Sequence, residues 1–437
     1  MKFFTIFLYE WRHFVRTPFK LVAIFLFAGA STYALQNGAS LFHKQTEELE
    51  SIEAEMLTDR ATYLAYYDSG EKGPKARPWV DLTTPYWAVW YTPVYHFKKP
   101  SPAMVYSIGQ AEQYGFYKSV NFRSSTYDAD MAEEIANPER LQSGTLDFSF
   151  VSLYLLPLLL LIFLYNVKGA EADEGFLSLI YTQTGTERTW LWARVSFYGG
   201  LVAVLLLVLM LLGAALTGVS PTAIPSFFSL YLWHLLYLGL WLFLFGLILW
   251  QGKSTIGNTL QMLGVWLLLA FIIPAAVHQW VSIRQPPSLM TDLIDAQRDD
   301  TYALYDEPDS VLQARVLALF PEMSNNLTDE AGQPKRIAAN QAATALSNEL
   351  IKASIGKIEG RNQSRNRLIS YSYWFNPVSF MLNKLNQLSG THYQDYQAYR
   401  DEIQQMIDKQ IKVLVLDTWN GVEVNKQKYL EYQQSLN

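Results

Sequence analysis

Apolar residues gather along this chain in five long runs that are separated by polar stretches. The runs cover residues 20–38, 148–167, 195–219, 227–250 and 259–281. Each run is close to or above the roughly 20 residues that an α-helix needs to cross about 30 Å of hydrocarbon. The pattern therefore predicts a polytopic α-helical membrane protein with five transmembrane helices. A long charged leader precedes the first run, which we interpret as a retained helix and not as a cleaved signal.

Basic residues in the short flanks of the runs predict the orientation of the chain. With the N-terminus inside, most of them fall on the cytoplasmic side: Lys2, Arg12, Arg16, Lys20, Lys168, Arg188, Arg194 and Lys253. The short loop GVSPTAIPS on the other side contains none. Residues 1–19 are then a cytoplasmic interfacial helix, and 168–194 are a second cytoplasmic segment. Two long regions, 39–147 and 282–437, lie outside the cytoplasm.

The two outer regions differ in the spacing of their apolar residues. Residues 44–68 have a helical pattern, and the Pro-rich and aromatic-rich stretch that follows favours loops and short strands. The first outer region is therefore expected to be a mixed α/β domain. The second is expected to be mainly α-helical, because apolar residues recur at helical spacing over 289–319, 337–358 and 392–415.

A sixth span would have to come from residues 368–385, LISYSYWFNPVSFMLNKL. Ser, Asn and Lys interrupt this stretch too often for a helix that faces lipid. We interpret it as a helix at the outer interface, with Tyr371, Tyr373 and Trp374 at the depth of the lipid headgroups.

Composition narrows the chemistry of the chain. Of its 437 residues half are hydrophobic, the net charge is −6, and there is no long basic tract, which argues against nucleic acid as a partner. The absence of cysteine excludes thiol catalysis, disulfides and cysteine-bound metals. The stretch GLILWQGKST at 246–255 departs from the phosphate-binding loop pattern and ends an apolar run, so the chain is not expected to bind ATP itself. The sequence also contains no catalytic or metal-binding motif. We expect no enzyme activity, metal or cofactor in this chain.

The polar stretch between the second and third runs has an unusual pattern. Glu171, Asp173 and Glu174 open it, and Phe176, Leu179 and Ile180 follow at helical spacing. The sequence TQTG then breaks the helix, and Thr184 with Glu187 has the spacing of a capping box for the next helix. The pattern predicts an amphipathic helix at the inner membrane surface. The alternative is a connecting loop whose acidic side chains are only solvated.

This stretch, GAEADEGFLSLIYTQTGTERTWLWARV, resembles the region after the second span in type-2 ABC exporter permeases. Glu171, Glu174 and Gly175 stand in the acidic and glycine places, Phe176 and Leu177 replace the usual Thr-Leu, and 186–188 replace the Ser-Arg turn. Other stretches resemble the subgroup related to gliding-motility and nitrous-oxide-reductase maturation permeases, which carries a large outer domain: YEWRHFVRTPFK, YALQNG, YSIGQAEQYGFYKSV, NPERLQSGTLDFSFVSLYLLPLL and NPVSFMLNKLNQLSGTHYQDYQAYRDEI. The family usually has six spans, whereas five are expected here.

The resemblance implies a function, a set of partners and a set of contact residues. The chain is then a permease subunit that couples ATP hydrolysis on a separate ABC ATPase dimer, where ATP and Mg are bound, to export or extraction of an unknown substrate. It would work in a bacterial inner membrane as a dimer with a second copy or a sister permease. The residues implied in ATPase coupling are Glu171, Asp173, Glu174, Gly175, Phe176 and Arg188. The N-terminal helix would add a second contact through Glu10, Trp11, Arg12 and Arg16.

Three alternatives stay open at this point. Phe176 is equally well interpreted as a lipid-facing side chain. The large outer regions suit a mechanotransmission or scaffold subunit that acts on an outer partner without transport. The aromatic stretch with Trp79, Trp87, Trp90 and Tyr91 is expected to pack a small core, and the alternative is a surface that binds an outer partner or a lipid-linked substrate.

Single polar and proline residues of the spans give further expectations. The runs contain no acidic or basic residue at mid-depth, which favours an external energy source over ion coupling. His234 and His278 are expected to form hydrogen bonds between helices. Pro157 and Pro274 are expected to kink their helices, and Asp147 to cap one.

Overall fold

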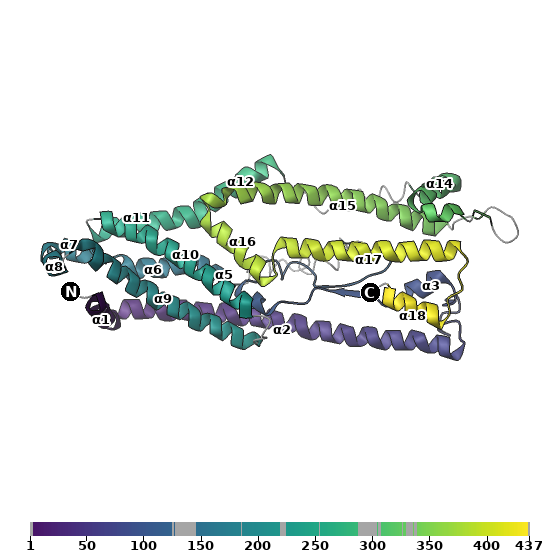
Figure 1. Cartoon of the computed structure of the whole chain (residues 1–437), viewed down its shortest axis with the longest axis horizontal. Coiled ribbons are helices and arrows are strands. Elements are labelled where there is room, and N and C mark those ends of the chain that lie inside the picture. The colour runs from purple at the N-terminus through teal and green to yellow at the C-terminus, as the bar shows by residue number, and fades with distance from the viewer. Residues whose placement is uncertain are drawn as a thin grey trace.

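The protein is an elongated assembly of helices (Figure 1). The computed structural model describes residues 3–124, 126, 146–184, 186–218, 224–252, 254–286, 304, 307–325, 327–328, 335 and 339–435. Helices α1 (Phe3–Val15), α7 (Gly169–Asp173) and α8 (Leu177–Thr184) lie together at one end of the long axis, here named the α7–α8 end. The helices α14 (Asp309–Leu319), α17 (Tyr393–Trp419) and α18 (Lys426–Ser435) extend to the opposite end.

Five helical segments in the described part of the chain are long and apolar enough to cross a membrane. They are Pro18–Ser69, Phe148–Asp173, Arg188–Thr217, Ile224–Gln251 and Thr255–Arg284. Each overlaps one of the five predicted runs, and all but the third, which ends at Thr217, contain the run completely. The prediction of an α-helical membrane protein with five candidate spans is therefore confirmed. Their side chains form one continuous apolar core, the bundle core, centred on residues such as Leu156, Tyr198 and Trp241.

Helix α2 (Pro18–Ser69) is a single uninterrupted helix of 52 residues. Pro18 starts it, because proline is tolerated in the first turn, and Gly70 ends it with a backbone φ of +70°. At 1.5 Å per residue the helix is about 78 Å long. The first predicted span and the polar helix predicted over 44–68 are therefore one rod that runs from the bundle into the opposite half of the molecule (Figure 1).

Both prolines that were expected to kink spans follow a π-helical turn. In the second span α5 (Phe148–Phe150) leads into the π-turn η3 (Val151–Leu155), and α6 (Leu156–Leu164) begins one residue before Pro157. In the fifth span α11 (Thr255–Leu267), the π-turn η5 (Leu268–Ile272) and α12 (Ile273–Arg284) repeat this order before Pro274. A proline removes a backbone donor and crowds the preceding turn, and a wider turn relieves that crowding.

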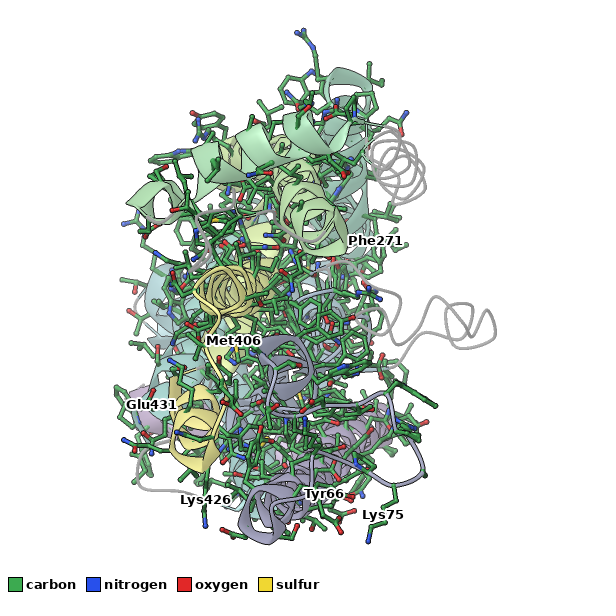
Figure 2. The ribbon with its side chains drawn as sticks, turned by 90° about the vertical axis from the view of Figure 1, so that its right-hand side faces the viewer. Tyr66, Lys75, Phe271, Met406, Lys426 and Glu431 are labelled. Carbon is green, nitrogen blue, oxygen red and sulfur yellow. The ribbon has the colours of Figure 1, made fainter. Side chains whose placement is uncertain are left out.

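The half of the molecule beyond the spans, here named the distal region, has a second apolar core. Helix α15 (Ala339–Tyr371), helix α17 and the distal part of α2 form successive layers, and Met406 marks α17 between the other two in the end-on view of Figure 2. The short helix α3 (Pro85–Trp90) packs on α17, and η6 (Pro321–Asn325) follows α14. Strands β1 (Tyr95–Phe97) and β2 (Tyr117–Ser119) pair antiparallel, with His96 opposite Lys118. Short strands beside helices agree with the mixed α/β composition expected for the first polar region.

Residues 368–385 are not a continuous helix. Helix α15 ends at Tyr371, the 3-10 turn η7 (Ser372–Trp374) follows, and α16 (Pro377–Ser389) begins at a cap formed by Asn376. The expectation of one interfacial helix is wrong for α16, because Val378, Met381 and Leu385 are buried in the bundle core. Aromatic side chains are exposed around the turn before it: Tyr371 is 68%, Trp374 is 96% and Phe375 is 55% exposed.

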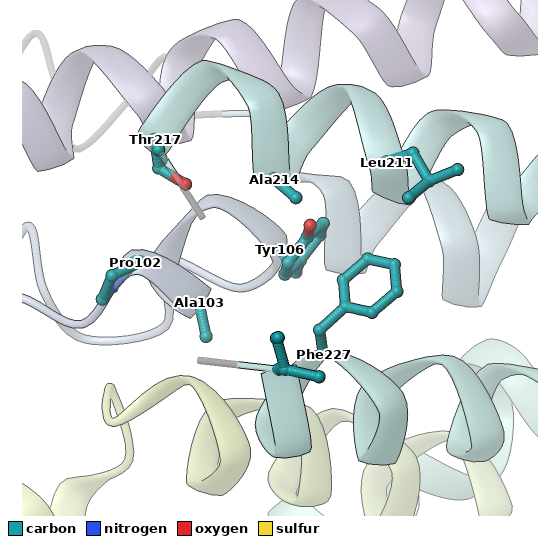
Figure 3. Close-up of a pocket in the computed structure, with 9 residues that line it drawn as sticks. Pro102, Ala103, Tyr106, Leu211, Ala214, Thr217 and Phe227 are labelled. Carbon is teal, nitrogen blue, oxygen red and sulfur yellow. The ribbon is translucent and has the colours of Figure 1, made fainter. Parts of the chain in front are cut away.

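The 3-10 helix η1 (Pro102–Tyr106) inserts between the distal ends of α2, α9 (Glu187–Thr217) and α10 (Ile224–Gln251). Tyr106 points toward Ala214 and Phe227 across a small apolar cavity of about 210 Å³ (Figure 3). Its hydroxyl donates a hydrogen bond to the carbonyl of Met210 over 2.5 Å. A short apolar 3-10 helix therefore closes the distal end of the bundle.

Gly38 sets how closely η1 approaches α2. A Cβ atom at this position would lie 2.8 Å from both the Cα and the carbonyl oxygen of Val105, whereas Gly29 on the same helix has no atom within 4 Å of the corresponding point. Replacing a helical glycine by alanine ordinarily stabilises by up to about 1 kcal/mol, but overpacking costs about 1–3 kcal/mol. We predict that Gly38→Ala lowers the melting temperature in detergent while Gly29→Ala keeps or raises it. Equal melting temperatures for the two variants would contradict the close contact.

Candidate functional site

A cluster of buried charges joins three helices at the α7–α8 end. Arg194 of α9 is 6% exposed and bridges two carboxylates. Its Nε lies 2.5 Å from Glu10 Oε1 of α1, and its Nη1 donates to Glu171 Oε1 of α7. The guanidinium also lies 4.9 Å from the ring centroid of Trp190. One side chain therefore holds α1 and α7 against α9.

Lys20 of α2 extends the cluster to a fourth helix. Its ammonium is buried and donates to the hydroxyl oxygen of Tyr198 over 2.8 Å and to the carbonyl of Phe163 over 2.9 Å. The Tyr198 hydroxyl in turn donates to Glu10 Oε2 over 3.0 Å. Glu10, Lys20, Glu171, Arg194 and Tyr198 are named the charge cluster below. Its two acids and two bases balance, which is what burial of charge requires.

Helix α7 is also fixed on its other side, to the turn between α10 and α11. Lys168 has a backbone φ of +69°, and its ammonium donates to the carbonyl of Trp250 over 2.7 Å. A Cβ atom on Gly169 would lie 2.7 Å from the Cα of Thr255, so only glycine fits there. Asp173 accepts a hydrogen bond from the backbone N–H of Thr255 over 3.2 Å. These contacts leave α7 little freedom to move independently of the bundle.

Helix α8 has one face on the bundle and one face in the open. Gly175, with φ of +78°, turns the chain between α7 and α8. Leu177 and Ile180 pack on the bundle core, while Phe176 is 53% and Leu179 is 56% exposed. A helix is therefore present where one was predicted, but Phe176 and Leu179 are exposed while Ile180 packs on the bundle. Glu174 and Phe176 come just before its first residue, Leu177, and are exposed.

The cap of α9 differs from the prediction. Helix α8 continues through Thr184, and the side chain of Thr186 caps α9 by accepting from the N–H of Thr189 over 3.3 Å. The capping role predicted for Thr184 is wrong because that residue still belongs to the preceding helix. Arg188 follows the cap, is exposed, and lies 5.0 Å from the ring centroid of Trp250.

The predicted contact residues divide into two groups. Glu10 and Glu171 are turned into the charge cluster, where each pairs with the buried Arg194, and their part in coupling stays a prediction. Asp173 is bonded to Thr255. The residues with exposed side chains or surfaces are Trp11, Arg12, Arg16, Asp173, Glu174, Gly175, Phe176 and Arg188. Sequence reasoning missed Lys20, Arg194 and Tyr198 as partners, and the only signal was the charge of Lys20 and Arg194 at the edge of an apolar run.

The aromatic stretch of the distal region is mostly packed, in line with its expected core role. Trp90 stacks on Tyr86 at 6.4 Å between ring centroids and contacts the ring of Phe122 edge-on at 5.5 Å. Trp87 stacks on Tyr91 at 6.0 Å. Trp79 differs, since it is 66% exposed.

Three further polar residues have the following contacts. His234 is buried between helices, with Nε2 3.2 Å from the Ser152 hydroxyl, as expected for a hydrogen bond between spans. Asp147 caps the helix that begins at Phe148 by accepting from the N–H of Phe150 over 2.7 Å, which confirms its predicted role. His278 is exposed and lines a polar cavity described below. Among the described residues no group of three or more His, Asp or Glu is placed to hold a metal ion.

Comparison with known proteins gives one match. A family described as "Domain of unknown function (DUF3526)" matches residues 291–434, which include α14 to α17 and most of α18. The chain has no match among curated proteins or among solved structures.

Arg194 provides a direct test of the charge cluster. Removing one partner of a buried ion pair costs about 3–5 kcal/mol, because a charge is left without compensation. We predict that Arg194→Met strongly lowers the melting temperature of the purified chain. Arg188→Met, on the same helix but exposed, is the matched control and should cost about 1 kcal/mol or less. Adding Glu10→Gln and Glu171→Gln to Arg194→Met should recover much of the loss, and a triple variant less stable than the single one would contradict this account.

Proposed function

We propose that this chain is the membrane subunit of an ATP-driven ABC transporter and that α7 and α8 form its coupling element. The observation that carries the proposal is the contrast between the two sides of this segment. Phe176 and Leu179 are exposed on one side, while Glu171 is held on the other side by the buried Arg194. A partner that binds the exposed side would be connected to the bundle through a rigid contact.

The exposed side has the chemistry of a protein interface. Phe176 and Leu179 are apolar anchors, and the neighbouring Glu174 supplies a charge that a basic residue on a partner would pair with. The exposed Trp11 and Arg12 of α1, with Arg16 just after it, add a second contact surface at the same end. With the N-terminus in the cytoplasm, as the basic residues favour, both surfaces would face a soluble ATPase.

A displacement of α8 would have a defined path into the membrane. It would pass through α7 to Arg194 on α9, to Glu10 on α1, and through Tyr198 to Lys20 on α2. Because buried charges separate only at high cost, these helices would move together and not one by one. The π-turns before Pro157 and Pro274 are points where the second and fifth spans can bend during such a movement.

The rest of the proposed assembly follows from the resemblance of the chain to ABC exporter permeases. ATP and Mg would be bound by the partner ATPase, and two permease subunits would be needed, either two copies of this chain or one copy with a sister permease. The assembly would lie in a bacterial inner membrane with the distal region outside the cytoplasm. The substrate exported or extracted is not specified by the coupling element.

A second candidate function is mechanotransmission to an outer partner without transport. The observation that favours it is α2, which runs without a break from Lys20 in the charge cluster to Ser69 in the distal region. A movement at the α7–α8 end would thus reach the distal region directly. A substrate held between the spans would favour transport, whereas a stable outer complex with an empty bundle would favour mechanotransmission.

The exposed side of α8 is the place to test the proposal. We predict that Phe176→Ala combined with Leu179→Ala reduces the amount of ABC ATPase that co-purifies with the chain by at least about tenfold, as expected for the loss of two interface anchors. The measurement is affinity purification in mild detergent, identification of the bound proteins, and assay of ATP hydrolysis.

Ser178→Ala, exposed on the same helix, is the control and should leave the ATPase bound. Neither change touches the charge cluster, so the melting temperature should stay that of the unchanged chain. An ATPase retained by the double variant, or absent from all three preparations, would refute the proposed coupling element.

A further inference from the structure

A polar cavity of about 590 Å³ lies beside the distal end of the bundle, remote from the α7–α8 end. Its walls come from α12, the last turns of α15, α16, the start of α17 and the loop at Gln110. This volume is within the roughly 300–1,000 Å³ of small-molecule sites. Amide side chains dominate the lining, and no carboxylate contributes to it.

One set of polar side chains fixes the wall formed by α16 and the start of α17. The N–H of Gln394 donates to His392 Nδ1 over 3.1 Å, so the imidazole proton is on Nε2 and donates to Asn383 Oδ1 over 2.6 Å. Asn383 Nδ2 donates to the hydroxyl oxygen of Tyr373 over 2.5 Å. Burial lowers the pKa of His392, which favours this neutral form. The hydroxyl hydrogen of Tyr373 is left over and available to a ligand.

A second set of contacts holds the loop at Gln110 against this same wall, through Asn386 of α16 and Thr391 before α17. Gly109 has a φ of +54°, and a Cβ atom there would lie 2.7 Å from the Thr391 hydroxyl, so this close approach requires glycine. The Ser107 hydroxyl donates to Asn386 Oδ1 over 2.5 Å, and the N–H of Gln110 donates to the carbonyl of Thr391 over 3.2 Å. Gln110 is thereby positioned in the cavity by its backbone and not by its side chain.

The remaining lining groups have unused hydrogen-bonding capacity. The buried Gln110 Oε1 has no hydrogen-bond partner among the described residues. The side chains of Gln363, Asn366 and Gln397 line the cavity and form no hydrogen bond with any described residue, and Arg367 forms no ion pair with one. A buried acceptor without a partner is costly, so a bound ligand or ordered water is expected to satisfy it.

We propose that this cavity binds a polyhydroxylated ligand of the carbohydrate type. Each sugar hydroxyl both donates and accepts a hydrogen bond, and each amide side chain offers one donor group and one acceptor, so the two chemistries match along the amide part of the lining. A fixed wall beside lining groups that have no partner in the protein is the arrangement that binding sites use to limit the entropy lost on binding. The site is separate from the charge cluster and does not depend on the coupling role of α7 and α8.

The test uses the full chain in phosphatidylcholine nanodiscs, because alkyl maltoside detergents carry a disaccharide that would compete. An array of mono- and oligosaccharides is screened for binding, and the best free saccharide is titrated by calorimetry. We expect Asn366→Ala with Gln397→Ala to weaken binding at least tenfold, since both amides lack partners in the protein and their loss should leave the melting temperature unchanged. Gln427→Ala, an exposed amide on α18, is the control and should bind as the unchanged chain does.

A second arm of the same experiment distinguishes a free sugar from the sugar headgroup of a lipid. Nanodiscs that contain glucosyl-diacylglycerol are compared with nanodiscs that lack it, with hydrogen exchange of residues 107–110 and 363–373 as the readout. Protection by the glycolipid but not by free glucose would identify a lipid-linked sugar, and equal protection a free one. Failure of every saccharide and of the glycolipid to bind, or binding unaffected by the double variant, would overturn the assignment.

Discussion

The arrangement of the α7–α8 end depends on neutralising one buried guanidinium. Arg194 enters the bundle at the start of α9, where water cannot solvate it, so it requires carboxylates from other parts of the chain. Glu10 comes from a helix that precedes the first span and Glu171 from one that follows the second. The same requirement places Tyr198 and Lys20. Four helices that are distant in sequence are therefore fixed at one point, and the open face of α8 is defined relative to it.

The distal end of the bundle is held by a different kind of contact. Close backbone approach at Gly38 and the insertion of Tyr106 from η1 join α2, α9 and α10 without any charge. Helix α16 then buries its apolar face on the same bundle, so the carbohydrate-type cavity has one wall on the membrane helices and another on the distal region. A ligand there would contact both halves of the molecule.

Much of the helical architecture was predictable because it reflects local patterns. Runs of apolar residues marked all five candidate spans, Pro157 and Pro274 marked the irregular turns, and Asp147 marked a cap. The roles of individual acids were not predictable. Glu171 and Glu174 are three residues apart and look alike in the sequence, yet one is paired with Arg194 and the other is exposed. The difference depends on α9 and α1, whose positions no local pattern records.

The sequence by itself determined which segments are long and apolar enough to cross a membrane and where several helices begin or bend. Hydrophobic transfer and backbone preferences act over a few neighbouring residues, so a local pattern records them. Only the tertiary structure decided that α2 continues unbroken into the distal region, that 368–385 divides into α15, η7 and α16, and that Gln110 and Arg367 line one cavity. Buried charges and cavity walls are formed by residues far apart in the chain. Their partners are specified by packing in three dimensions.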